Sequence, residues 1–344
     1  MEFLLNIDVP KPDRKLTHGQ KILSVGSCFT EHIGKALQEA KFDLLQNPNG
    51  ILFDPVSVCS SLVSYIRNER YSEDHLFQLQ ELWHSWRHHS RFSGTDPHAV
   101  LNGINASQQA AHQFLKEADW LIVTLGSSFS YRLSETGATL STASGSSAAR
   151  AAVANCHRAP AQWFHKHLVT IDETISTLDN AIHQLFRFNP KLHVIFTISP
   201  VRHIRDGVVE NNRSKARLLE AVHHLVNKFD KLHYFPAYEL VIDVLRDYRF
   251  YDVDLVHPNY AATQFVLEHF LKTYTSEATQ QLIEEIKKIT TARRHRSQHA
   301  ETIAHQTFLK THLQKAQALQ QQYPYINLQE EIAYFEKEHR KDAG

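Results

Sequence analysis

The stretch ILSVGSCFTEHIGKAL, residues 22–37, passes from an apolar run to a helical pattern with only a glycine, a serine and a cysteine between them. Residues 21–25 predict a short buried strand, and the apolar spacing over 30–40 predicts a helix. Ser27 at such a turn is either the N-cap of the helix or a nucleophile, which backbone N–H groups and the helix dipole would assist. Cys28 leaves two interpretations open, a thiol of lowered pKa or a small buried hydrophobic side chain.

The same alternation of strand and helix continues along the chain. Residues 119–125 and 192–198 are apolar, β-branched runs that predict buried strands, and 231–236 is a weaker candidate. Helical patterns lie between and after them, at 98–118, 172–188, 212–229 and 261–274. Strands separated by helices predict an α/β protein with a parallel sheet and helices on both faces. Ligands bind such sheets beyond the carboxyl ends of the strands, so the residues directly after each strand are candidate site residues.

Two segments differ from this pattern. Residues 137–154 are rich in Gly, Ser and Ala and predict a mobile loop that could serve as a lid. Residues 276–344 are rich in Gln, Lys, Glu, Arg and His, with apolar side chains at helical spacing. We therefore expect a main domain over 1–275 and a helical appendage over 276–344. The appendage would pack on the main domain or on a second subunit, so a homo-oligomer through the C-terminal helices is one expectation.

The composition excludes several classes of protein. The 344 residues include 37 Lys and Arg against 37 Asp and Glu, without the positive excess that a nucleic-acid-binding face normally produces. With no run of about 18 apolar residues and no secretory leader, neither membrane association nor export is expected. The three cysteines, an odd and sparse set, suit a reducing compartment and predict a cytoplasmic protein. The 24 histidines predict a net charge that depends on pH near neutrality.

A candidate base for Ser27 stands late in the sequence. A serine nucleophile needs a base, and the base needs a group that orients it. Asp254 and His257 are three residues apart in DVDLVHPNY, just before the last helical pattern of the α/β region. In a tight loop this spacing can aim both side chains the same way, so that the carboxylate supports the imidazole. Pro258 suits the first turn of the next helix and leaves His257 at its start.

Further candidates follow the other predicted strands. Gly126 permits close approach of the backbone and Ser128 could donate hydrogen bonds, although TLGSSFSYR is equally an ordinary strand-ending turn. In the turn NPNGILFDP, Gly50 could supply an oxyanion-binding N–H. Arg202 and His203 follow residues 192–198, where substrate would lie. We expect these residues to bind substrate or oxyanion.

Histidines and tryptophans are concentrated in LWHSWRHHSRFSG, residues 82–94. The spacing of His84, His88 and His89 could support a metal ion, yet no Cys, Asp or Glu lies within the cluster. We therefore prefer a wall of aromatic and histidine side chains in which His88 and His89 contact substrate, and we expect no metal and no cofactor. Asn155 comes just past the predicted loop and either reaches the site or anchors the loop.

Together these residues resemble the GSCFA family, whose motif reads GSCFT at 26–30. The resemblance covers roughly residues 20–270 and includes the blocks SWRHHSRFSG, TLGSSFSYR, VANCHRAP, TISPVRHIRDGVVENNRSKARLL, YFPAYELVIDVLRDYRFY and DLVHPN. The family is similar to the SGNH/GDSL hydrolase superfamily, which implies a flavodoxin-like three-layer α/β/α sandwich and ester or acyl-transfer chemistry. The resemblance implies Ser27 as nucleophile, His257 as base and Asp254 as its orienting group.

The sequence departs from the superfamily pattern at two places. The usual Gly-Asp-Ser is Gly-Ser-Cys here, with the serine directly after the glycine. The asparagine that normally serves the oxyanion is missing from GSSF, so Ser128 or Asn155 would have to take its role. A missing oxyanion donor costs about 2.7–4 kcal/mol of transition-state stabilisation, which is compatible with slow or specialised chemistry.

The expected function is therefore that of an esterase or O-acyltransferase acting on an acylated small molecule or carbohydrate. The alternative is a non-catalytic module that binds a glycan or another ligand on a decayed hydrolase fold. The missing asparagine favours this alternative, and the presence of serine, histidine and aspartate opposes it. A third hypothesis is a metal-dependent enzyme that uses His84, His88 and His89, which the metal content of untagged protein would test.

Overall fold

A computed structural model of the chain describes residues 5–141, 152–299 and 301–341. At its centre lies a five-stranded parallel sheet in the order β2-β1-β5-β8-β9. The strands are β1 (Lys21–Gly26), β2 (Asp43–Gln46), β5 (Trp120–Leu125), β8 (His193–Ile198) and β9 (Leu232–Tyr234). The predicted strands at β1, β5, β8 and β9 are confirmed, whereas β2 was not predicted. The sequence pattern missed β2 because its four residues, DLLQ, lie partly exposed at the sheet edge and form no apolar run.

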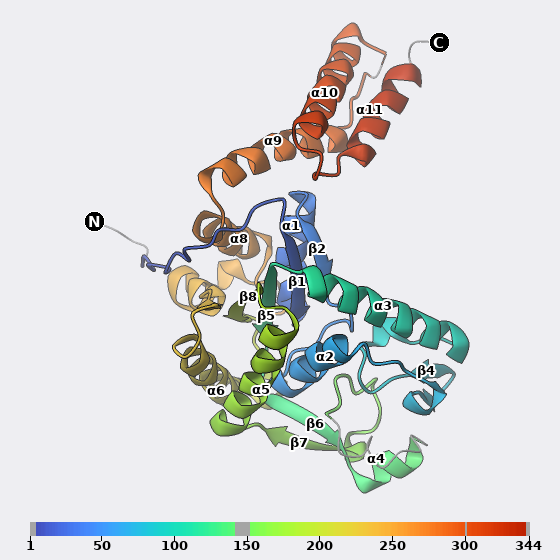
Figure 1. Ribbon diagram of the computed structural model, residues 1–344, viewed down its shortest axis with the longest axis vertical. Coiled ribbons are helices and arrows are strands. Elements are labelled where there is room, and N and C mark those ends of the chain that lie inside the picture. Colours follow the sequence, from blue (N-terminus) through green and yellow to red (C-terminus); the bar gives the residue numbers. More distant parts are fainter. Residues whose placement is uncertain (1–4, 142–151, 300, 342–344) are drawn as a thin grey trace.

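Helices cover both faces of the sheet (Figure 1). One face carries α2 (Pro55–Arg67), α3 (Pro97–Glu117), α5 (Ile171–Phe188) and α6 (Val208–Val226), and the other carries α1 (Cys28–Glu39) and α8 (Tyr260–Tyr274). Successive side chains of a strand point to opposite faces, so Leu23 and Val25 pack in the first layer while Ile22 packs in the second. The predicted three-layer α/β/α architecture is confirmed.

Three helix starts differ from the prediction. Helix α6 begins at Val208, four residues before the predicted start at 212. The first helix begins at Cys28, two residues earlier than the apolar spacing indicated, so Ser27 occupies the N-cap position. The helix α2 was not predicted, because Asp54 and Pro55 were interpreted as part of a turn. In the structure the Asp54 carboxylate accepts hydrogen bonds from the N–H groups of Val56 and Ser57, and Pro55 takes the first helical position.

Smaller elements surround the carboxyl edge of the sheet. Two antiparallel hairpins form from β3 (Phe77–Leu79) with β4 (Leu82–His84) and from β6 (Phe129–Leu133) with β7 (Phe164–Leu168). The expected loop over 137–154 was wrong at its start, because residues up to 140 belong to α4 (Glu135–Leu140), which Ser134 caps. Residues 142–151, on which the lid interpretation rests, lie outside the described residues.

The predicted C-terminal helical appendage is confirmed. It consists of α9 (Glu277–Arg294), α10 (Ile303–Gln322) and α11 (Gln329–Lys341), which extend away from the main body (Figure 1). These helices share a hydrophobic cluster of their own, formed by Leu282, Ile286, Ile289, Ala292, Leu309, Ala316, Ile326, Leu328 and Phe335. None of the described helices has the length and apolar character needed to cross a membrane.

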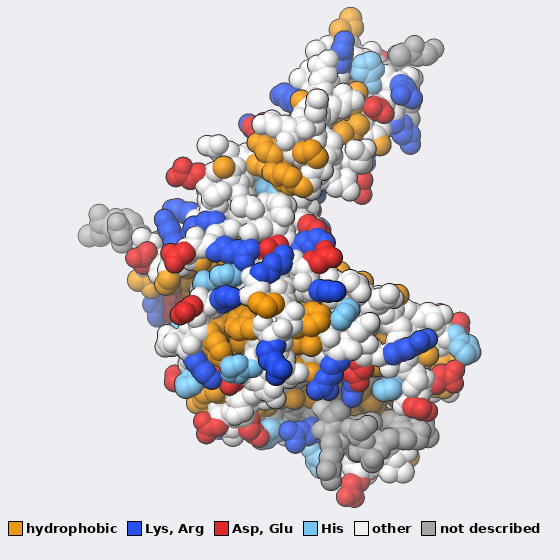
Figure 2. Space-filling view, viewed as in Figure 1, with side chains coloured by type: hydrophobic (Ala, Val, Ile, Leu, Met, Phe, Trp, Pro, Cys, Tyr) orange, Lys and Arg blue, Asp and Glu red, His pale blue; other side chains and the backbone are white. Residues whose placement is uncertain are grey.

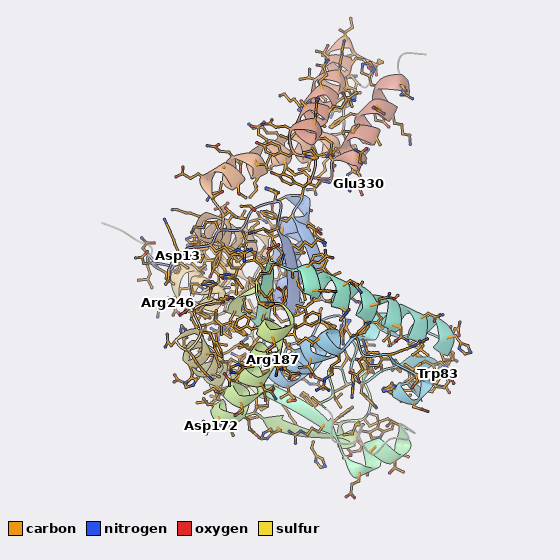
Figure 3. The ribbon with its side chains drawn as sticks, in the orientation of Figure 1. Asp13, Trp83, Asp172, Arg187, Arg246 and Glu330 are labelled. Atoms are coloured by element: carbon orange, nitrogen blue, oxygen red, sulfur yellow. The ribbon has the colours of Figure 1, made fainter. Side chains whose placement is uncertain are left out.

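Buried and charged contacts join this appendage to the main body. Ile283 of α9 packs into the hydrophobic cluster on the α8 side of the sheet. Glu331 of α11 is buried, with its carboxylate 2.9 Å from Lys41 Nζ and 3.0 Å from the guanidinium of Arg293. Charged side chains gather at this junction (Figure 2), and Glu330, labelled in Figure 3, forms a 2.8 Å ion pair with Arg293 there.

The two ends of the α/β domain meet. The Leu16 N–H, just before β1, donates a 2.7 Å hydrogen bond to the carbonyl of Tyr274 at the end of α8. The adjoining bridge pairs Leu16 with Thr275, and both Leu16 and Tyr274 are fully buried. Between β9 and α8 the chain forms the short α7 (Ala237–Glu239) and a π-helical turn over Leu240–Leu245, which complete this side of the core.

Candidate functional site

The turn between β1 and α1 requires a glycine. Gly26 has φ of +146°, and a Cβ at this residue would lie 2.2 Å from the Thr124 carbonyl oxygen of β5. The Gly26 N–H donates a 2.9 Å hydrogen bond to Asn47 Oδ1, at the end of β2. Asn47 is itself buried and left-handed, with φ of 45°. Contacts from both neighbouring strands therefore fix the backbone that leads into Ser27.

Ser27 occupies the N-cap position of α1, but its side chain makes no capping hydrogen bond. Its N–H donates to the Thr124 carbonyl at 3.0 Å. The hydroxyl is buried, and among the residues that the structure describes it has no hydrogen-bond partner. The Ser27 side chain therefore does not cap the helix, and its expected role as a nucleophile stays a prediction.

Ser27 and His203 meet over Gly126, the residue that follows β5. A Cβ placed on Gly126 would lie 3.2 Å from Ser27 Cβ and 3.3 Å from His203 Nε2, with Phe53 Cβ at 3.0 Å. His203 Nε2 is also a buried atom without a hydrogen-bond partner among the described residues. Two residues with unpartnered polar groups therefore lie beside the same glycine, around a gap in which a methyl group would be tight.

Lys215, in the second turn of α6, was not identified from the sequence. It is fully buried, and its ammonium group donates to the carbonyls of Gly126 at 2.5 Å and of Ser199 at 2.6 Å. These carbonyls follow β5 and β8, so Lys215 holds the ends of two strands beside Ser27. Burial lowers the pKa of Lys215 to about 7, and nearby Arg202 contributes in the same direction.

Asp254 and His257 form the pair that their spacing predicts. Asp254 Oδ2 lies 2.6 Å from His257 Nδ1, while Asp254 Oδ1 accepts the N–H groups of Val256 and His257 at 2.9 and 3.0 Å. The pKa of Asp254 falls to about 2, because the His257 N–H, the His257 side chain and the Val256 N–H all stabilise the carboxylate. The carboxylate thus fixes the orientation of the imidazole and leaves Nε2 to face outward.

Backbone contacts connect this pair to the space over Gly126. The Arg202 N–H donates a 3.2 Å hydrogen bond to the carbonyl of Val256, which joins the loop after β8 to the loop that carries His257. The adjacent His203 is anchored by its N–H, which donates to Asn211 Oδ1 at 2.8 Å. Burial lowers the pKa of His203 to about 4, and the nearby Lys215 and His257 add to the effect.

Several backbone donors near the site are already in use. The Gly50 N–H donates to the Asn47 carbonyl at 2.7 Å, and the Gly126 N–H donates to the Phe53 carbonyl at 2.8 Å. The Ser128 N–H donates to Ser214 Oγ at 2.7 Å, and the Ser128 hydroxyl donates to the Ser214 carbonyl at 3.0 Å. The N–H groups of Gly50 and Gly126 and both donors of Ser128 therefore have protein partners, and their proposed roles at an oxyanion stay predictions.

The predicted histidine wall divides into two parts. His89 packs against Gly50, where a Cβ would lie 2.2 Å from His89 Cβ. His88 is buried instead, with Nδ1 2.9 Å from Ser85 Oγ and its ring against Tyr71. The structure therefore encloses His88 in an aromatic cluster, where it stabilises the loop.

Neighbouring residues complete this cluster. His157 Nε2 lies 2.9 Å from the Ser85 carbonyl, and its ring lies 4.5 Å from that of His84. Asn155 accepts the His157 N–H at 2.8 Å, so its side chain anchors the segment before the 3-10 turn at 161–163. Within the described ranges, no group of three or more His, Cys, Asp or Glu residues is arranged to hold a metal ion.

Cys28 is the first residue of α1 and is partly exposed. Burial raises the pKa of its thiol, and the N–H groups of Phe29 and of Cys28 itself oppose that rise. Its neighbours in the hydrophobic cluster on the α8 side are apolar, which agrees with a side chain that mainly packs. The raised pKa is opposite in direction to that of a low-pKa thiol, and the placement agrees with the packing interpretation.

Comparisons with known proteins agree with the motif blocks. The GSCFA family model matches residues 21–270, and a model described as the C-terminal domain of GSCFA domain proteins matches residues 286–341. No curated protein matches the chain. Among solved structures, a family 3 carbohydrate esterase from Clostridium thermocellum matches with 11% identity and a TM-score of 0.34, covering 77% of this chain and 98% of its own. Similarity at that level assigns neither fold nor activity.

Proposed function

The chain belongs to the GSCFA family, and we propose that it is an esterase or O-acyltransferase acting on an acylated small molecule or carbohydrate. Ser27 is the proposed nucleophile, His257 the base and Asp254 the group that orients the base. The observation that carries the proposal is the 2.6 Å contact between Asp254 Oδ2 and His257 Nδ1. The loop that contains this pair is hydrogen-bonded to the loop after β8, in which His203 lies beside Ser27. The serine, the base and its carboxylate thus come from loops at the carboxyl edge of one sheet.

The proposed reaction begins with attack of Ser27 Oγ on the ester carbonyl carbon. The hydroxyl proton passes to His257 Nε2, and the carbonyl electron pair moves to the oxygen. Collapse of the tetrahedral intermediate releases the alcohol, which takes the proton from His257. A water molecule then releases the acid, or an acceptor hydroxyl takes the acyl group. Hydrogen bonds between nucleophile and base often form only once substrate is bound, so binding has to bring Ser27 and His257 together.

A fluorophosphonate probe with peptide mapping tests this proposal directly. Trypsin should release residues 22–35, ILSVGSCFTEHIGK, as one peptide, and fragmentation can separate Ser27 from Ser24 and Thr30. We expect the label on Ser27. Ser27→Ala and His257→Ala should each remove nearly all cleavage of p-nitrophenyl esters, and Asp254→Asn should lose on the order of 10⁴-fold in rate. The double variant Ser27→Ala/His257→Ala should lose little more than either single variant, because the members act as a unit.

Cys28→Ala is the matched control for the nucleophile. It changes the residue next to Ser27 and should keep most of the activity. A serine hydroxyl needs a base such as His257, oriented by Asp254, to remove its proton, whereas a thiol loses its proton more easily and depends less on such a pair. An enzyme that iodoacetamide inactivates, and whose Ser27→Ala variant remains active, would transfer the role to Cys28.

One observation favours the second candidate function, a non-catalytic module that binds a glycan or another ligand. The N–H groups of Gly50, Gly126 and Ser128 are bonded within the protein, which leaves fewer donors for an oxyanion. Absence of any Ser27 label, together with binding of a carbohydrate ester that survives Ser27→Ala, would support the module. A cytoplasmic location remains part of the proposal, and it rests on the free thiols of Cys28, Cys59 and Cys156.

A further inference from the structure

A serine hydrolase of this kind needs hydrogen-bond donors where negative charge develops on the carbonyl oxygen. The backbone donors expected there from the sequence already have partners, since the N–H groups of Gly50, Gly126 and Ser128 are bonded within the protein. A side chain beside Ser27 is therefore a better candidate than these N–H groups to donate a hydrogen bond to the oxyanion. His203 Nε2 is such an atom, because it is buried, has no partner among the described residues and borders the same space over Gly126 as Ser27 Cβ.

We infer that His203 is a catalytic residue that donates a hydrogen bond from Nε2 to the oxyanion formed when Ser27 attacks. This inference rests on the proposed function and assigns His203 a task separate from that of His257. Its imidazole would act as a neutral electrophile, in the Nε2–H tautomer, while His257 moves the proton.

The surroundings of His203 suit a neutral donor. Its backbone is fixed through Asn211, and its ring lies 5.6 Å from that of Phe53, so the imidazole is held in place before substrate arrives. The charged groups that act on it are Lys215, His257 and Lys166, which disfavour its protonation, and Asp206, which favours it. With burial as the largest effect, the pKa of His203 falls to about 4, so its imidazole is neutral near pH 7.

Three variants of the full chain test the role. His203→Leu removes the donor, His203→Gln keeps an N–H on a side chain of similar reach, and His224→Leu repeats the substitution at an exposed position of α6. The readouts are the rate of fluorophosphonate labelling at Ser27, kcat and KM for p-nitrophenyl acetate across pH, and thermal unfolding. We expect His203→Leu to lower kcat by about 10²–10³-fold with little change in KM. His203→Gln should recover at least about tenfold of that loss, and the acid limb of the pH profile should stay in place because it belongs to His257.

Other outcomes separate the inference from the proposed function. Wild-type kinetics in His203→Leu, with activity still lost in Ser27→Ala and His257→Ala, would overturn only the role of His203. Loss of the acid limb in both His203 variants, with no rescue by Gln, would show that His203 is a base and would also overturn the inference. If the wild-type protein neither labels at Ser27 nor cleaves esters, the proposed function is wrong and the inference is wrong with it.

Discussion

At the scale of single residues, the absence of a side chain at Gly126 matters because Ser27, His203 and Phe53 lie close around it. Its position demands no positive φ, so an alanine meets no backbone penalty there, but an added Cβ would enter the space between Ser27, His203 and Phe53 at 3.0–3.3 Å. That distance requires the neighbours to shift by only a few tenths of an ångström. The glycine therefore matters more for the surroundings of Ser27, the proposed nucleophile, than for the fold.

Gly126→Ala should accordingly lose activity while keeping the fold. We expect a fall in kcat/KM for p-nitrophenyl esters of up to about 10²-fold, the cost of a displacement of about 1 Å, because the added Cβ pushes on Ser27 and His203. Melting should fall by only a few degrees, as followed by circular dichroism. Activity equal to wild type would show that substrate does not use this space.

Gly103→Ala is the matched control. Gly103 lies within α3, and an added Cβ would meet nothing within 4 Å. The substitution should leave activity unchanged and stabilise the protein by roughly 0.5–1 kcal/mol, because alanine favours a helix over glycine.

Elements of the sheet could be predicted to different extents from the sequence. The strands β1, β5 and β8 are buried on both sides, so their apolar runs are distinctive, and the βα alternation around them defines the fold class. The hairpins and β2 mix exposed and buried positions over three to five residues, which leaves no clear period. The contact between Asp254 and His257 could be anticipated because both residues belong to one loop, three positions apart.

Other parts of the site depend on contacts that no local pattern contains. Lys215 is buried because it bonds to the carbonyls of Gly126 and Ser199, which lie 89 and 16 residues away in sequence. The enclosure of His88 likewise depends on Tyr71 and Phe92, whose rings lie against it. A lysine or a histidine is rarely expected to be fully buried, so the burial of Lys215 and His88 can be seen only in the folded chain.

The histidine cluster around this hairpin should make the fold sensitive to acid. Burial lowers the pKa of His88 to about 3 and that of His157 to about 4, so both stay neutral in the folded protein while the unfolded chain binds protons near pH 6.5. Their contribution to stability is complete above pH 6.5 and is lost as the pH falls toward 4. We expect the free energy of unfolding, from urea titrations, to drop by about 2 kcal/mol per histidine between pH 6.5 and 4.5.

The variant His88→Asn tests this prediction through the slope of the free energy of unfolding against pH, and not through the absolute value of that free energy. The variant should take up about one proton fewer than the wild type on unfolding at pH 5. An identical slope in wild type and His88→Asn would show that His88 is already protonated in the fold.

At the scale of the whole molecule, the chain combines an α/β domain with a three-helix appendage that has its own hydrophobic cluster. The junction depends on Ile283 and on the buried Glu331 between Lys41 and Arg293. The domain boundary at 275 stays a prediction, and so does a homo-oligomer through the appendage.

Truncation after Thr275 should leave a soluble domain that melts cooperatively, at a lower temperature than the full chain. The decrease follows from loss of Ile283, which is 8% exposed and packs on the α8 side of the sheet. Ile283→Ala in the full chain should reproduce part of this decrease, because it should lower the free energy of unfolding by about 2–5 kcal/mol. Gel filtration and thermal unfolding measure both. A truncated protein that only aggregates would mean that the appendage covers core surface and that the boundary is wrong.

The bond between Leu16 and Tyr274 also sets an order of events during synthesis. The segment before β1 leaves the ribosome first, yet its partner emerges only after nearly all of the α/β domain has been made. Strand β1 can pair early with β2, whereas closure around Leu16 must wait for α8. The appendage is translated after that point, so the nascent domain can close once α8 has left the exit tunnel, before the appendage has emerged. A stalled chain long enough to place residue 275 outside the tunnel would therefore display the completed domain while still attached to the ribosome.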